Sequence, residues 1–219
     1  VIAPATSVAE GNSGTATALV TVSLANAPGG LDVVVSFETE SVTATAGADY
    51  TAIVGGSLTF TSGGATAQTI TVSVLGDTVD EVDETFRVKL TGTDNALAPV
   101  GSAVGVVTIV DDDTVTLNVL PGTFSEAAGS AAAVVVELVG VSDRAVTVSY
   151  ATADLTAVNV GDFFTTFGTL TWPANSVSGT KRTAPVVIVD DAVAEGAEAF
   201  QVSISAPTSG AVLGTALAQ

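Results

Sequence analysis

Cysteine, histidine and methionine are all absent from this chain of 219 residues. Without cysteine, the chain forms no disulfide and offers no thiolate to a metal or a substrate. Without histidine, it has no imidazole for zinc, for copper or for acid–base catalysis near neutral pH. The candidate metal ligands that remain are oxygen atoms, which suit hard cations such as calcium and magnesium.

Positive charge is scarce. Five Lys and Arg residues face 23 Asp and Glu residues, for a net charge of −18. Nucleic acid and anionic membrane surfaces are therefore poor partners. The chain is nevertheless 47% apolar, with a mean hydropathy of +0.58, so it has enough apolar residues for a buried core. No apolar run is long enough for a membrane span and no signal peptide is visible, so we expect no membrane insertion.

The chain contains two copies of one unit. The acidic run Asp77–Phe86 recurs in altered form as Asp191–Phe200, a shift of 114 positions. Further matched pairs are Glu10 with Glu126, Asp49 with Asp162, and Phe60 with Trp172. These matches predict two tandem domains at 1–113 and 114–219. The second stops midway through the strand that matches Val104–Val110, and the chain begins without Met, so we expect a piece of a larger protein.

The local pattern in each repeat has a period of two and is rich in β-branched residues. It predicts strands that include residues 18–24, 33–37, 69–74, 86–90 and 104–110, separated by glycine-rich turns. About seven short strands in ~110 residues, with no helical period, indicate a sandwich. The predicted fold is all-β, with two tandem immunoglobulin-like antiparallel β-sandwiches, the second lacking the end of its last strand.

Carboxylates gather where these strands end. Asp77, Glu81 and Glu84 recur at short spacing around the Val79 carbonyl, and Asp111–Asp113 follow the last strand of the first repeat. Calcium takes about six to eight such oxygens. An isolated acidic run is usually a solvated loop. The duplication of this run, and the separate acids Glu10 and Asp49, favour a calcium site in the first repeat. For the second repeat, a calcium site and a solvated loop are about equally favoured.

Several motifs together resemble a Calx-β domain, in two copies that cover nearly the whole chain. They are Val-x-Glu-Gly at Glu10, Asp49-Tyr50, Glu84-Thr85-Phe86 and the terminal Ile-Val-Asp-Asp-Asp. In calcium-binding members, such as the regulatory domain of sodium–calcium exchangers, these positions form a multi-ion site at one end of the sandwich. The resemblance implies these ligands in the first repeat: Glu10, Asp49, Asp77, the Val79 carbonyl, Glu81, Glu84, Asp111, Asp112 and Asp113. The second-repeat equivalents are Glu126, Asp162, Asp190, Asp191, Val193, Glu195 and Glu198.

The first repeat departs from the family pattern at one position. The family often has a further acid just before the residue equivalent to Asp77, and here that residue is Gly76. Asp190 restores the acid in the second repeat.

The function that we expect is a calcium-binding structural or adhesive repeat module of a larger exported, bacterial surface protein. Asp111–Asp113 lie between the repeats, so calcium there would stiffen the junction. The expected partners are calcium ions, neighbouring repeat domains and a protein or glycan surface. The alternatives are a calcium-sensing regulatory module, or an accessory module beside an enzyme or carbohydrate-binding domain. Glu81 and Glu84 could form an acid–base pair, but no insertion that would form a pocket accompanies them, so we expect no enzyme.

Aromatic residues offer a weaker alternative site. Trp172 and Phe163 replace Phe60 and Tyr50 of the first repeat, which favours core positions over a sugar-binding platform. Phe164 and Phe167 replace Thr51 and Val54, which are not aromatic, so a role in binding a ligand such as a sugar remains an alternative for them. Lys181 and Arg182 lie where the second repeat is two residues longer, and we expect them in a solvated turn, with pairing to an acidic neighbour as the alternative.

Overall fold

The structure is a computed structural model that describes residues 2, 5–26, 28–94, 104–126, 131–193 and 195–218. The part of the chain that it describes is all strand, turn and loop, and it contains no helix. Two compact units are present. The first comprises Val1–Thr78 and Val82–Asp113, and the second comprises Val79–Glu81 and Thr114–Gln219. The predicted fold class, two β-sandwiches in one all-β chain, is confirmed.

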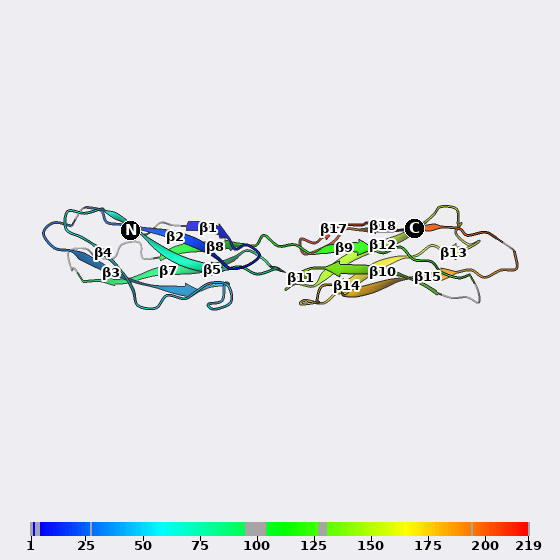
Figure 1. The fold of residues 1–219 in the computed structure, drawn as a ribbon, viewed down its shortest axis with the longest axis horizontal. Coiled ribbons are helices and arrows are strands. Elements are labelled where there is room, and N and C mark those ends of the chain that lie inside the picture. Colours follow the sequence, from blue (N-terminus) through cyan, green and yellow to red (C-terminus); the bar gives the residue numbers. More distant parts are fainter. Residues whose placement is uncertain are drawn as a thin grey trace. The chain divides into compact units, whose positions relative to one another are not determined.

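The first unit pairs a five-stranded sheet with a two-stranded one (Figure 1). The larger sheet has the order β1 (Ala5–Ala9), β8 (Val104–Val110), β7 (Glu84–Thr93), β3 (Val33–Ser41), β4 (Gly56–Phe60). The smaller sheet is β2 (Thr15–Ser23) against β5 (Ala67–Leu75). Strand β1 runs parallel to β8, whereas β8 runs antiparallel to β7. As a result, the residues that follow β1 and β8 lie at the same end of the sheet.

Alternating side chains build the core of the first unit. Along β2, for example, Ala18, Val20 and Val22 are buried and the residues between them are exposed, as a strand with one inward face requires. Tyr50 and Phe86 are fully buried and stack with ring centroids 4.2 Å apart. This stack fixes the beginning of β7 immediately after the acidic loop.

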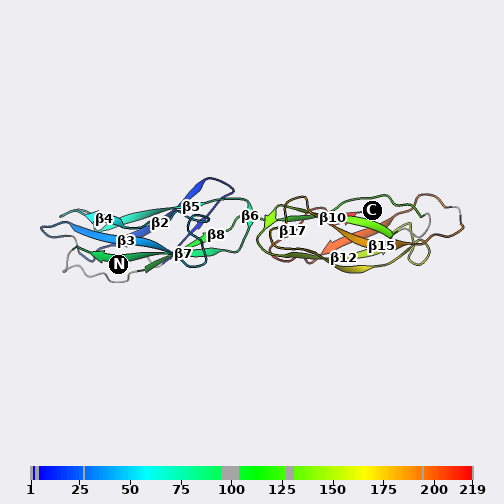
Figure 2. The ribbon, with the colours of Figure 1, turned by 90° about the horizontal axis from the view of Figure 1, so that it is seen from below.

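The second unit also has two main sheets (Figure 2). One has the order β13 (Phe163–Phe164), β15 (Lys181–Ile188), β10 (Ala131–Val139), β9 (Thr116–Val119), β17 (Val212–Leu213). The other has the order β14 (Phe167–Trp172), β12 (Val146–Asp154), β16 (Phe200–Ser205), β18 (Leu217–Ala218). A short parallel pair, β6 (Val79–Asp80) with β11 (Val141–Ser142), completes this unit.

Trp172 and Phe163 lie in the core of the second unit, with no exposed surface. The indole Nε1–H of Trp172 donates a hydrogen bond to the Thr180 carbonyl at 2.9 Å, so its polar atom is satisfied. The prediction of core roles for both residues is confirmed. The prediction of a turn at Lys181 and Arg182 is wrong, because both lie in β15, where cross-strand pairing with β10 outweighs their polar character.

The second unit also contains a buried ion pair. The Nη2 of Arg144 lies 2.8 Å from Oδ1 of Asp80, whose side chain is only 3% exposed. Asp80 belongs to β6, and its carbonyl accepts a hydrogen bond from the N–H of Asp143. A carboxylate with so little exposed surface needs a charged partner to remain ionised at low cost. Arg144 supplies that partner.

Candidate metal centres

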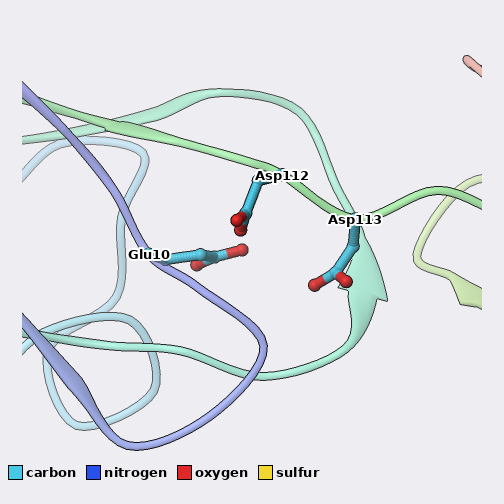
Figure 3. Close-up of side chains that lie close together, drawn as sticks. All are labelled: Glu10, Asp112 and Asp113. Carbon is cyan, nitrogen blue, oxygen red and sulfur yellow. The ribbon is translucent and has the colours of Figure 1, made fainter.

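Three carboxylates of the first repeat meet beside the end of β8 and form the Glu10 cluster: Glu10, Asp112 and Asp113 (Figure 3). Each offers an oxygen within 4.8 Å of those from the other two. The parallel register of β1 and β8 brings them together. Ala9 pairs with Val110, and the N–H of Glu10 donates to the Val110 carbonyl at 3.2 Å.

Backbone and side-chain donors orient the Glu10 cluster. The N–H of Gly11 donates to Oδ1 of Asp112 at 3.0 Å, and Nδ2 of Asn12 donates to Oδ1 of Asp113. Asp111 accepts from the N–H of Asp113 at 3.3 Å. Glu10 is itself buried, with 5% of its surface exposed. A buried carboxylate between two others carries an electrostatic cost that a cation would remove.

Three other carboxylates of the first repeat form the Glu81 cluster: Asp49, Glu81 and Glu84, again with oxygens within 4.8 Å of one another. Asp49 closes a tight turn, because its Oδ2 accepts a hydrogen bond from the N–H of Thr45 at 2.5 Å. Its carbonyl accepts from the N–H of Leu75, which anchors the turn to the end of β5. Glu84 is the first residue of β7.

The second repeat reproduces this arrangement in the Glu195 cluster: Asp162, Glu195 and Glu198. These positions are the sequence equivalents of Asp49, Glu81 and Glu84. The turn is reproduced too, since Oδ2 of Asp162 accepts from the N–H of Val158 at 2.6 Å. The sequence thus places the same three carboxylates together in both repeats.

Crowding changes the acidity of the Glu195 cluster. Loss of hydration, followed by repulsion from Asp162 and Glu126, raises the pKa of Glu195 above its ordinary value. Loss of hydration and the negative charge of Asp162 likewise raise the pKa of Glu198. In the cation-free protein, the folded form therefore binds protons more readily than the unfolded form. Its free energy of unfolding falls as the pH rises through the range of these raised pKa values.

One family model matches the chain twice, at residues 3–113 and 111–218, and it describes a Calx-beta domain. The chain belongs to the Calx-beta family. Domains of this family commonly bind calcium, and the carboxylate clusters described above are present in both repeats of this Calx-beta chain. Among the residues that the structure describes, no helix is long and apolar enough to cross a membrane.

Several solved structures are similar to the chain. The crystal structure of CBD12 from CALX1.2 is 24% identical over 93% of this chain and 78% of that one, with a TM-score of 0.45. The calcium-binding domain CBD12 of CALX1.1 is 24% identical over 93% and 76%, with a TM-score of 0.46. The apo form of the Calx CBD1 domain is 27% identical over 50% and 91%, with a TM-score of 0.43. No curated protein matches the chain.

Not all of the predicted ligands of the Calx-beta chain fall in the three clusters. The carboxylates of Asp77 and Asp111 in the first repeat, and of Glu126, Asp190 and Asp191 in the second, lie outside them. Ligation by the Val79 and Val193 carbonyls stays a prediction. Oδ1 of Asp191 accepts from the N–H of Val193 at 2.6 Å, which closes a local turn. Glu126 lines a cavity of the second unit together with all three carboxylates of the Glu195 cluster.

Sequence reasoning missed two residues that orient ligands. Asn12 donates to Asp113, and Oδ1 of Asp83 accepts from the N–H of Asp111 at 3.2 Å. Asp83 has Ala197 as its equivalent, so a comparison of the two repeats passes over it. Asn12 belongs to none of the recognised motifs. The only feature of the sequence that could have identified it is its position directly after Glu10-Gly11.

Gly76, where the Calx-beta pattern often has an acid, lies against the loop that carries Glu10. A Cβ at this position would lie 1.9 Å from the Gly11 carbonyl oxygen and 2.6 Å from that of Glu10. Both contacts are with backbone, which cannot rotate away. The departure from the family pattern therefore has a steric cause, because the close approach of Gly11 requires glycine here.

Proposed function

We propose that the chain is a calcium-binding structural or adhesive module of an exported bacterial surface protein. The observation that carries this proposal is the duplication of one carboxylate cluster, Asp49, Glu81 and Glu84 in the first repeat and Asp162, Glu195 and Glu198 in the second. An acidic loop that served only as solvated surface would have no reason to bring the same three positions together twice. The Glu10 cluster adds a second candidate centre in the first repeat.

The geometry of these clusters suits calcium. Two oxygens bound on opposite sides of one calcium ion lie about 4.6–5.2 Å apart, since each bond is about 2.3–2.6 Å long. Oxygens within 4.8 Å of one another can therefore share an ion with little movement. Carboxylates and carbonyls are the ligands that calcium prefers, and a strand-end loop can adapt to its variable geometry. Magnesium requires a tighter octahedron and retains more of its waters.

The first test is calorimetric titration of chelator-treated protein with Ca²⁺ and then Mg²⁺, with a melting curve before and after. We expect saturable heat with Ca²⁺ that Mg²⁺ does not reproduce, and a raised melting temperature. At about 100 times the dissociation constant, each site adds about 2.7 kcal/mol to the free energy of unfolding. A dissociation constant near ~10⁻⁴–10⁻³ M would fit an extracellular module. Micromolar affinity would favour an intracellular sensor, and the absence of heat would refute calcium binding.

Calcium at the Glu10 cluster would also act on the junction between the repeats. Asp112 and Asp113 immediately precede Thr114, where the second repeat begins, so an ion there ties the end of one repeat to the chain entering the next. In the calcium-free state the clustered charges repel one another, and the junction should bend more freely. We therefore propose that calcium stiffens the junction, as a load-bearing surface protein would require.

The absence of cysteine makes this stiffening simple to measure. Single cysteines at Leu31 and Val177, which are 74% and 69% exposed, would carry one spin label in each unit. We expect a narrow distribution of inter-label distances with calcium and a broad one with chelator. An equally broad distribution in both conditions would refute the stiffening role, even if the titration shows binding.

A further inference from the structure

The turns that carry Asp49 in the first repeat and Asp162 in the second are built alike. In each, the aspartate N–H donates to the carbonyl four residues earlier at 3.0 Å, and the aspartate side chain accepts from the N–H of that same earlier residue. The aspartate carbonyl accepts a further hydrogen bond at 2.8 Å, from the N–H of Leu75 in the first repeat and of Val189 in the second. The two turns therefore share one hydrogen-bond pattern.

The left-handed position of this turn holds a different residue in each repeat. Gly47 occupies it in the first repeat with a φ of +91°, and Val160 occupies it in the second with a φ of +76°. Both N–H groups donate to the carbonyl three residues ahead, that of Tyr50 at 2.8 Å and that of Phe163 at 2.7 Å. The second repeat therefore forms the glycine turn of the first with a β-branched residue.

Val160 is strained in this conformation. The left-handed region brings the Cβ of an ordinary residue close to its own backbone, and a β-branched residue is least suited to it. The Val160 side chain is 63% exposed, so packing compensates for little of the strain. The hydrogen bond to Phe163 and the bonds made by Asp162 hold the turn in place instead. The strain therefore opposes the bonds that position Asp162 in the Glu195 cluster.

Gly161 offers an unstrained alternative to this turn. It follows Val160 directly, and glycine adopts the left-handed region without steric cost. The bend can therefore pass from Val160 to Gly161, and this change would rotate the next residue, Asp162, away from the cluster. The first repeat lacks the alternative, because Ala48 follows Gly47 there.

Repulsion favours the same change in the calcium-free protein. Asp162, Glu195 and Glu198 offer oxygens within 4.8 Å of one another, so rotation of Asp162 away from the other two lowers the repulsion. The change stays local, because Ala157 and Phe163, on either side of the turn, are buried. Opening of the turn therefore displaces one calcium ligand without disturbing the core.

We propose that Val160 sets the calcium affinity of the second repeat, because the turn of residues 158–162 opens in the calcium-free protein and calcium has to close it. A site that is competent in only part of the molecules binds with an affinity lowered by that fraction. Val160 is thus a positioning residue that acts through Asp162. The effect on calcium rests on the proposed function, whereas the opening of the turn does not.

The variant that tests this inference moves the glycine by one position. Val160→Gly with Gly161→Ala gives the second repeat the Gly-Ala order of the first and keeps one glycine in the turn, so the entropy of the unfolded chain changes little. Alanine fits at position 161, because a Cβ there would lie 3.5 Å from the nearest atom, in the Val158 side chain. We expect calcium to bind the Glu195 cluster about fivefold more tightly, which corresponds to about 1 kcal/mol.

NMR of the isotope-labelled 219-residue chain resolves the two repeats. Exchange of the Val160 and Asp162 amide hydrogens with solvent reports opening of the turn, and a calcium titration followed at the same signals gives the affinity of this site. In chelator, relative to unfolded-chain rates, we expect these hydrogens to exchange at least fivefold faster than those of Gly47 and Asp49. Calcium should slow them, and the variant should slow them about fivefold without calcium.

The reciprocal variant in the first repeat is the matched control. Gly47→Val with Ala48→Gly should speed exchange at Asp49 and weaken calcium binding at the Glu81 cluster about fivefold, while the second repeat stays unchanged. If Val160 has only a structural role, moving the glycine should raise the melting temperature and leave exchange in the turn and calcium affinity as they were. That result would overturn the inference.

The outcomes distinguish this inference from the proposed function. Slower exchange in the Val160 variant, with no response to calcium in either protein, would refute the calcium site and with it the effect on affinity, while confirming that the turn opens. Calcium binding of equal affinity in the variant and the unaltered protein would refute the inference and leave the proposed function standing.

Discussion

Replacing Glu10 with glutamine is expected to lower calcium affinity in the first repeat about a hundredfold. Glu10 is the most buried member of its cluster, with 5% exposure, and the substitution removes one negative charge while keeping the shape of the side chain. Loss of an outer partner of a metal ligand already costs about 10–100-fold in affinity, so loss of a ligand should reach the upper end. A hundredfold loss of affinity corresponds to about 2.7 kcal/mol of binding free energy. Calorimetric titration of the variant and the unaltered protein with Ca²⁺ measures the two dissociation constants.

The same variant should have the opposite effect without calcium. Because Glu10 lies beside Asp112 and Asp113, removal of its charge relieves repulsion, and Glu10→Gln should melt at a higher temperature than the unaltered protein in chelator. A merely structural role for Glu10 would lower the melting temperature in both conditions. Glu38→Gln is the matched control: it removes the same charge from an exposed side chain paired with Lys89 at 4.0 Å. Equal calcium affinity in the two variants would contradict a ligand role for Glu10.

The architecture could be predicted from the sequence because one physical rule governs most of the chain. A strand with one inward face alternates in polarity, and β2, with its buried Ala18, Val20 and Val22, shows this alternation directly. The duplicated acidic loop could be predicted for a related reason. Two copies of one pattern reveal which positions the fold retains, and Glu81 with Glu195 and Glu84 with Glu198 are among them.

Other features depend on contacts between residues far apart in the chain, which a local pattern does not encode. The family resemblance implied that Glu10, Asp112 and Asp113 share one site, but no residue pattern near Glu10 specifies the parallel register of β1 and β8 that brings the three together. The backbone approach that requires glycine at position 76 is of the same kind. The extra length of the second repeat near Lys181 and Arg182 indicates a turn, but both residues lie in β15, which needs only its alternate residues to face inward.

The pair of Asp80 and Arg144 also could not be predicted from the sequence. Asp80 stands within an acidic run, where it looks like one more candidate for a solvated or metal-binding loop. The structure instead buries it in β6, against β11 of the second unit, with Arg144 at 2.8 Å. Arg144 is one of only five basic residues in a chain with 23 acidic ones, and it pairs closely with this buried acid. Burial explains this selectivity, because a charge pair is strongest where water is excluded.

Replacing Arg144 with methionine is therefore expected to lower the free energy of unfolding of the second unit by about 3 kcal/mol. Methionine keeps much of the packing volume but leaves the Asp80 carboxylate buried without its cation, a loss that typically costs about 3–5 kcal/mol. We expect the lower end of this range of free energies because the Arg144 side chain is 29% exposed, so water partly screens the ion pair. Trp172, the single tryptophan, lies in the core of the second unit, so urea unfolding followed by its fluorescence reports on this unit.

Lys181→Met provides the matched control for this loss. It also replaces a base with methionine, but its ion pair with Glu137 is long, at 3.6 Å, and the Lys181 side chain is 54% exposed, so the cost should stay below about 1 kcal/mol. The double variant Asp80→Leu with Arg144→Met should recover most of the lost stability, because it removes the orphaned charge as well as its partner. If Arg144→Met alone cost no more than Lys181→Met, Asp80 would not depend on Arg144, and its burial would need another explanation.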